Sequence, residues 1–171
     1  PPSRKHTRAT DAAEVPNRPP GRTVVLFVQT DFARNAVRTK GQMKFRRHAE
    51  KIIRALDPDD RVGVFSFDSH LKFRSDLTTD RDAAIDAFRE TIRINRPTAP
   101  ARVPAPSLAE HLDGQAMRDA ATSEKALQIV AGALSHIKGT KILLLLGWGL
   151  GERVGNVVQM RPGWPSVRRA L

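Results

Sequence analysis

Hydrophobic and polar positions form blocks along the chain that predict alternating strands and helices. Short apolar runs with β-branched residues are typical of buried strands. Four segments have this pattern, the third in a shorter and more polar form: Arg22–Gln29, Arg61–Asp68, Leu71–Leu77 and Lys141–Leu146. Apolar residues spaced by about 3.6 positions predict one face of a helix. This spacing occurs over three segments: Ala36–Leu56, the residues following Thr79-Asp80, and a stretch from Thr122 or Ser123 to Gly139.

The order of these elements predicts an α/β sheet with helices on both faces, because apolar strands alternate with amphipathic helices. The third strand follows the second after a tight turn at Ser69-His70, so it should be antiparallel and lie at an edge. The remaining strands should be parallel. Leu108–Asp119 is expected to be a short polar segment, and the Gly-rich stretch Gly147–Gly155 (GWGLGERVG) a mobile loop.

Proline content divides the chain into a lead-in and one domain. Residues 1–21 contain five prolines and no aromatic residue, so they cannot bury enough apolar surface to fold and should be flexible. Residues 22–171 are expected to form a single domain, interrupted by a second Pro-rich segment at Asn95–Ser107.

The longest predicted helix has an apolar face and a basic face. Its apolar face consists of Phe45, Ala49, Ile52, Ile53 and Leu56. Its basic residues form one stripe: Lys40, Lys44, Arg47, Lys51 and Arg54. Like charges at these spacings repel one another. A bound polyanion or acidic protein would relieve that repulsion, whereas a solvated face with counterions is the simpler interpretation.

Composition narrows the candidate chemistry. The 171 residues carry a formal charge of +11, and 13 basic against 4 acidic side chains fall within residues 1–55. The chain has no cysteine, which excludes thiolate metal sites and cysteine nucleophiles. The longest apolar run, Ile142–Leu146, is far shorter than a membrane span. Asp68, Ser69 and His70 are consecutive and cannot readily align as a catalytic triad, so we expect no enzyme activity.

Several phrases resemble a von Willebrand factor type A (VWFA) domain of the bacterial VWFA-related subgroup. They are "LDPDDRVGVFSFDS", "LTTDRDAAIDAF" and "ATSEKALQIVAGALSHIKGTKILLLLGWG", and the resemblance covers about residues 22–171. It implies a three-layer, Rossmann-like sheet and a protein-interaction or adhesion role. Because the family's sheet continues further, it also implies that the chain is truncated at its C-terminus, and an exported location is favoured over a cytoplasmic one.

The resemblance also implies a metal-ion-dependent adhesion site that binds Mg²⁺, and here the sequence departs from the family. The Asp-x-Ser-x-Ser positions are occupied by Gln29, Thr30, Asp31, Phe32 and Ala33. The loop threonine falls on Ala116 or Thr122, depending on register, and the later aspartate is Gly147, followed by Trp148. Only Asp31, and in one register Thr122, could still donate oxygen ligands, which is a poor set for Mg²⁺.

These residues favour a degenerate adhesion site that holds no metal and needs no cofactor. The predicted function is a non-catalytic module that binds a protein partner at the strand ends, around Gln29, Thr30, Asp31, Thr122 and Trp148. The alternative is a basic domain that binds nucleic acid or another polyanion along the helix stripe.

Overall fold

The computed structural model of the protein describes residues 21–30, 36–92, 107–147, 149–155, 157–160, 164–165 and 168, with 36–44, 152, 153 and 158 described by their backbone only. Its elements are, in chain order, β1 (Thr23–Gln29), α1 (Ala36–Arg54), β2 (Arg61–Phe67), β3 (Leu71–Thr78), α2 (Arg81–Ile92), the 3-10 helix η2 (Ala109–His111), α3 (Gly114–Arg118), α4 (Ser123–Ser135), β4 (Lys141–Leu146), β5 (Glu152–Val154) and β6 (Val157–Gln159).

The main sheet has the strand order β3-β2-β1-β4. β1 is parallel to both β2 and β4, and β3 is antiparallel to β2. The predictions of an α/β sheet, of parallel pairing and of an antiparallel edge strand after the Ser69-His70 turn are therefore confirmed. In the parallel register Val24 lies between Val62 and Ile142.

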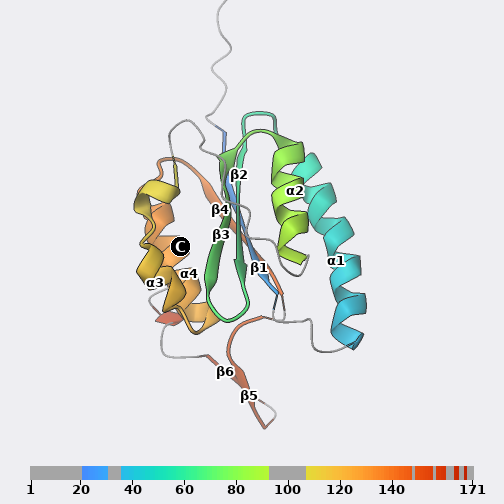
Figure 1. The fold of residues 1–171 in the computed structure, drawn as a ribbon, viewed down its shortest axis with the longest axis vertical. Helices are drawn as coiled ribbons and strands as arrows, with labels where there is room; N and C mark the ends of the chain where they lie inside the picture. The colour runs from blue at the N-terminus through green and yellow to red at the C-terminus, as the bar shows by residue number, and fades with distance from the viewer. Residues whose placement is uncertain are drawn as a thin grey trace, which may run out of the picture.

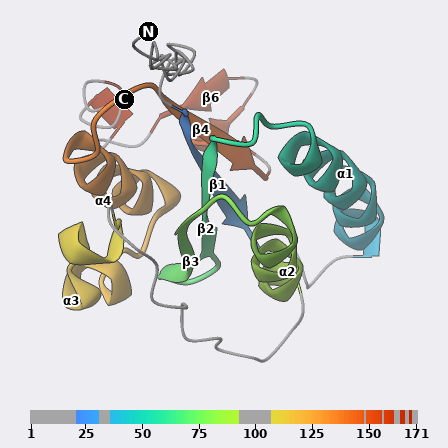
Figure 2. The ribbon, with the colours of Figure 1, turned by 90° about the horizontal axis from the view of Figure 1, so that it is seen from above.

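Helices lie on both sides of this sheet, α1 and α2 on one and α3 and α4 on the other (Figure 2). Alternate residues of β1 enter the two cores: Phe27 packs in the cluster that contains Leu127 of α4, and Leu26 in the cluster that contains Ile53 of α1 and Phe88 of α2. Every residue of β1 is buried as a result, which is why its sequence is apolar from Val24 to Val28.

Two predicted boundaries shift where the Asp60 side chain accepts hydrogen bonds from backbone groups. β1 begins at Thr23 rather than Arg22, whose N–H donates to the Asp60 carboxylate at 2.8 Å. α1 ends at Arg54 rather than Leu56, because the following backbone turns so that the N–H of Asp57 reaches Asp60 Oδ2 at 3.1 Å. Gly21, the last residue of the predicted lead-in, lies close to the Asp59 backbone, since a Cβ on it would be 1.8 Å from the Asp59 carbonyl oxygen. Residues 1–20 lie outside the described part.

Three further expectations about burial and local structure are wrong. Ile52, predicted on the apolar face of α1, is 41% exposed. The segment expected to be polar contains η2 and α3 and buries Leu108 and Met117. The expected Gly-rich loop contains β5, which pairs with β6 as a hairpin that projects beyond the main sheet (Figure 1). The paired residues Val154 and Val157 are exposed there. The hairpin therefore lacks the buried apolar face whose sequence pattern predicts a strand.

Candidate functional site

The carboxyl ends of β1 and β4 lie side by side and form the candidate site. Because Val28 pairs with Leu146 in the parallel register, the next residues of the two strands, Gln29 and Gly147, come together. Ligands of open α/β sheets bind beyond the carboxyl ends of their strands. We call this region the carboxyl edge, defined by Gln29, Thr30, Thr122, Ser123 and Gly147.

The Gln29 side chain links three segments at this edge. Its Nε2 donates to Ser123 Oγ at 2.9 Å and to the carbonyl oxygen of Gly149 at 3.0 Å. A carbonyl oxygen can only accept, so this contact identifies which end of the amide is the nitrogen. Gln29 is only 7% exposed. The amide therefore ties β1 to the start of α4 and to the loop after β4.

Gly147 is required by the position of Gln29. A Cβ built on Gly147 would lie 2.1 Å from Gln29 Oε1 and 2.8 Å from Gln29 Cβ, far inside van der Waals contact. The resemblance implies an aspartate at each of these two positions. Here one position carries a long amide and the other has no side chain, and the amide fills the space that a second side chain would need.

A buried carboxylate, in addition to the Gln29 amide, forms a hydrogen bond to the loop after β4. Glu124, in the first turn of α4, is 3% exposed, and its Oε1 accepts from the N–H of Gly151 at 3.0 Å. A carboxylate in the first turn of a helix is also favoured by the helix dipole. Gly149 and Gly151 have φ angles of 98° and 86°, which favour glycine. The predicted mobile loop thus begins with a segment that two buried side chains hold in place.

The structure also describes three of the remaining predicted positions of the adhesion site. Thr30 donates its N–H to the Phe67 carbonyl at 2.7 Å, and its hydroxyl donates to the same oxygen at 3.3 Å. Thr122 is the N-cap of α4, and its Oγ1 accepts from the N–H of Lys125 at 3.2 Å. Ala116, the other position for the loop threonine, lies in α3. Asp31, Ala33 and Trp148 lie outside the described residues.

The side chains that the structure describes at the carboxyl edge do not fit a magnesium ion, because Mg²⁺ needs several oxygen ligands in fixed geometry. Gln29 presents its amide nitrogen to Ser123 and Gly149, and the Thr122 hydroxyl already accepts a hydrogen bond. Within the described ranges no three His, Asp or Glu side chains are grouped so that they could hold a metal.

Asp68, Ser69 and His70 meet at the β2–β3 turn, but not in the order of a triad. Ser69 Oγ lies 3.1 Å from Asp68 Oδ1 and 3.0 Å from His70 Nδ1, and the carboxylate is 3.9 Å from that same ring nitrogen. A triad needs the carboxylate and the hydroxyl on opposite nitrogens of the imidazole. Partial burial opposes ionisation of Asp68, but the Lys72 ammonium and the Ser69 N–H bring its pKa down to about 2.

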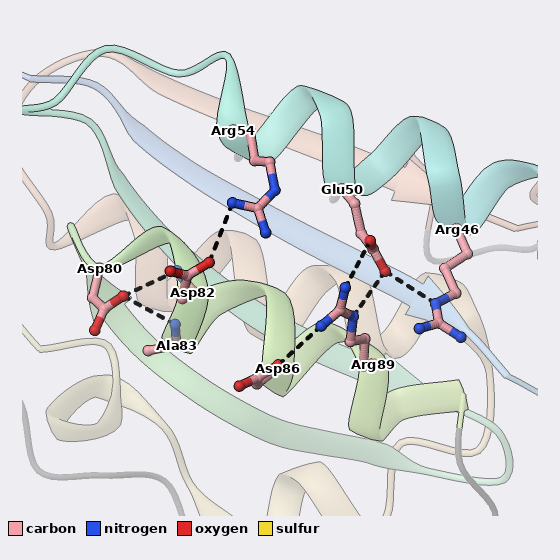
Figure 3. Close-up of polar contacts among 8 residues, drawn as sticks. All are labelled: Arg46, Glu50, Arg54, Asp80, Asp82, Ala83, Asp86 and Arg89. Carbon is pink, nitrogen blue, oxygen red and sulfur yellow. Dashed lines mark hydrogen bonds and ion pairs between the residues drawn. The ribbon is translucent and has the colours of Figure 1, made fainter.

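The basic stripe of α1 is partly neutralised by α2 (Figure 3). Arg54, one of its five members, forms an ion pair with Asp82 at 3.2 Å. Arg47 and Lys51 are exposed, and the side chains of Lys40 and Lys44 are not described. Beside the stripe, Arg46 and Arg89 both bind Glu50, and the distances from their Nε atoms to Glu50 Oε1 are 3.0 Å.

Glu50 should contribute to stability as the anion shared by two arginines. Hydrogen bonds from Arg89 and then Arg46 lower its pKa to about 2, although burial opposes this. We expect Glu50→Gln to reduce the free energy of unfolding by about 1–2 kcal/mol, as measured by urea denaturation. The matched control is Asp86→Asn, which removes a 73% exposed partner of Arg89 and should cost less than about 0.5 kcal/mol. Equal losses in the two variants would contradict the prediction.

No protein-family model matches the chain, and no curated protein matches its sequence. The VWFA resemblance therefore stays a prediction. Across the residues that the structure describes, no helix has both the length and the apolar character needed to cross a membrane.

Proposed function

We propose that the protein is a non-catalytic protein-binding module of the VWFA kind. Its fold would be the three-layer, Rossmann-like sheet of that family, and its adhesion site would be degenerate and hold no Mg²⁺. The element order and the mixed sheet support the first part of this proposal. The order of Asp68, Ser69 and His70 at their turn supports a role other than catalysis.

The observation that carries the proposal is the hydrogen-bonded amide of Gln29. At the position where the resemblance implies a metal-binding carboxylate, Gln29 donates to Ser123 and Gly149 and excludes any side chain at Gly147. Charged ligands would leave this edge dependent on a cation, whereas a satisfied amide makes it stable on its own. The edge is therefore suited to contact a partner directly.

The surface around this edge suits a protein partner. The β5–β6 hairpin begins a few residues after Gly147 and exposes Val154 and Val157, and Met160, directly after β6, is exposed as well. Exposed apolar side chains with a polar rim are typical of protein interfaces. The alternative, a polyanion along α1, is weaker because the Arg54 guanidinium already pairs with Asp82.

The metal-free part of the proposal predicts that Mg²⁺ does not bind. Titration of the chain with MgCl₂ by isothermal calorimetry should give no heat of binding at sub-millimolar affinity, since the described oxygen ligands are too few. Sub-millimolar binding that disappears in Asp31→Asn would show a working adhesion site and overturn this part of the proposal.

The partner-binding part can be tested with photo-crosslinking side chains at the two ends of the sheet. A crosslinker at Thr122 should capture a protein from the source cells in the presence of EDTA, and excess unlabelled chain should compete for it. The control places the crosslinker at Thr140, which is exposed and precedes β4 at the opposite end of the sheet. Equal capture at both ends, or capture that EDTA abolishes, would contradict a metal-independent site at the carboxyl edge.

A further inference from the structure

Two histidines that are 25 positions apart in the sequence meet on the surface. The rings of His111 and His136 stack with their centroids 4.5 Å apart and their planes 16° from parallel. His111 ends η2, and His136 is the C-cap of α4. Both side chains are exposed, so solvent and dissolved ions reach them.

The backbone under each ring is held by the fold. The N–H of His111 donates to the Leu108 carbonyl at 3.0 Å, and Leu108 itself is fully buried. The N–H of His136 donates to the Ala133 carbonyl at 3.3 Å, and the following residue, Ile137, is 2% exposed. The two rings therefore have fixed attachment points and need only side-chain rotation to change their mutual orientation.

Neutral imidazoles in such a pair are ligands for borderline divalent cations. Zn²⁺ binds imidazole nitrogen at about 2.0–2.1 Å, which places the centres of two imidazoles on one tetrahedral ion roughly 5 Å apart. The observed separation of 4.5 Å is slightly shorter than this. The side chains must therefore rotate so that the rings move apart slightly and tilt out of their parallel stack, with one nitrogen of each facing the ion. The carboxyl end of α4 adds a negative potential that favours a cation beside His136.

We propose that His111 and His136 together bind one imidazole-preferring divalent cation, for which Zn²⁺ is the probe. Water fills the remaining coordination positions. The site is separate from the carboxyl edge and does not depend on the function proposed for that edge. It differs in chemistry as well, because nitrogen ligands select Zn²⁺ over the hard cation Mg²⁺.

Calorimetric titration of the metal-free full chain with ZnCl₂ tests the site. We expect one Zn²⁺ per chain and a rise in the melting temperature with ZnCl₂, and neither effect with MgCl₂. His111→Ala and His136→Ala should each weaken Zn²⁺ binding at least about tenfold. His136→Phe should do the same although its ring can still stack, which separates ligation from packing.

The matched control is His48→Ala, which removes an exposed histidine from α1 and should leave Zn²⁺ binding unchanged. The proposal is overturned by any of three results. These are no Zn²⁺ binding to the unaltered chain, unchanged binding in either His111→Ala or His136→Phe, or an equal loss in His48→Ala. Urea denaturation of each variant without metal should give the stability of the unaltered chain, since the replaced side chains are exposed.

Discussion

Replacing Asp60 with alanine should lower the free energy of unfolding by about 3 kcal/mol, because a buried anion and its hydrogen bonds are lost together. Asp60 is 1% exposed. Its carboxylate accepts from the Arg22 guanidinium at 3.1 and 2.6 Å, from the Arg22 N–H at 2.8 Å and from the Asp57 N–H at 3.1 Å. The variant leaves these donors without their acceptor at the amino end of β1 and the end of α1.

The matched control is Asp57→Ala, because Asp57 binds the same guanidinium from the surface. Its Oδ2 lies 2.9 Å from Arg22 Nη2, but its side chain is 65% exposed. An exposed ion pair contributes less than about 1 kcal/mol. Urea denaturation of both variants measures the difference. A loss in Asp60→Ala no greater than that in Asp57→Ala would show that burial of this carboxylate does not matter.

The same carboxylate should make stability depend on pH. Hydrogen bonding from Arg22 lowers the pKa of Asp60 to about 2, although burial opposes it. A lowered folded-state pKa gives stability that is present above the unfolded-state pKa near 4 and is lost as the pH falls toward 2. The contribution is about 2 kcal/mol. The difference in the free energy of unfolding between the unaltered chain and Asp60→Asn should therefore narrow as the pH falls from about 4 to about 2. A difference that stays constant over this range would contradict the prediction.

Replacing Gly147 with alanine should destabilise the protein by about 2–3 kcal/mol, because the new Cβ overlaps the Gln29 side chain. That Cβ would lie 2.1 Å from Gln29 Oε1 and 2.8 Å from Gln29 Cβ. Gln29 cannot move aside without breaking its hydrogen bonds to Ser123 and Gly149. The variant therefore loses either the packing or the link between β1, α4 and the loop after β4.

A double-mutant cycle separates this overlap from backbone effects. In a Gln29→Gly background, which removes both the amide and the Cβ that the new side chain would meet, Gly147→Ala should cost less than about 0.5 kcal/mol, so the two changes should couple by about 2 kcal/mol. A second control is Gly132→Ala in α4, where a Cβ meets nothing within 4 Å. This variant should raise the free energy of unfolding by about 0.5–1 kcal/mol, because alanine favours a helix more than glycine does. If Gly147→Ala is equally costly with and without Gln29, the two residues do not depend on each other.

The candidate site was only partly predictable. Gln29, Gly147 and Thr122 were identified as residues of one edge, through the strand ends and the resemblance. The N-cap role of Thr122 is a local feature, because its hydroxyl accepts a hydrogen bond from the N–H of Lys125, only three positions later. The contributions of Ser123 and Glu124 were not predicted. No local pattern indicates that Gln29 donates to Ser123 or that Gly151 donates to Glu124.

Some buried polar groups gave no usable sequence signal at all. Asp57, Asp59 and Asp60 form a run that is typical of a helix end and a turn, and nothing in it distinguishes the buried member from the exposed ones. The distinction comes from Arg22, which lies 38 positions earlier and meets Asp60 only when β1 and β2 align. The exposed strands β5 and β6 were missed for the opposite reason, since they lack the burial pattern of a strand.

The sequence by itself determined the order of the main strands and helices along the chain and the parallel and antiparallel pairing. These depend on hydrophobic periodicity and on contacts within a few residues, which are local properties. The tertiary structure alone decided which distant polar residues meet. Gln29 with Gly147, Asp60 with Arg22 and His111 with His136 are set by strand register and helix packing, because long-range alignment has no signature in any single segment.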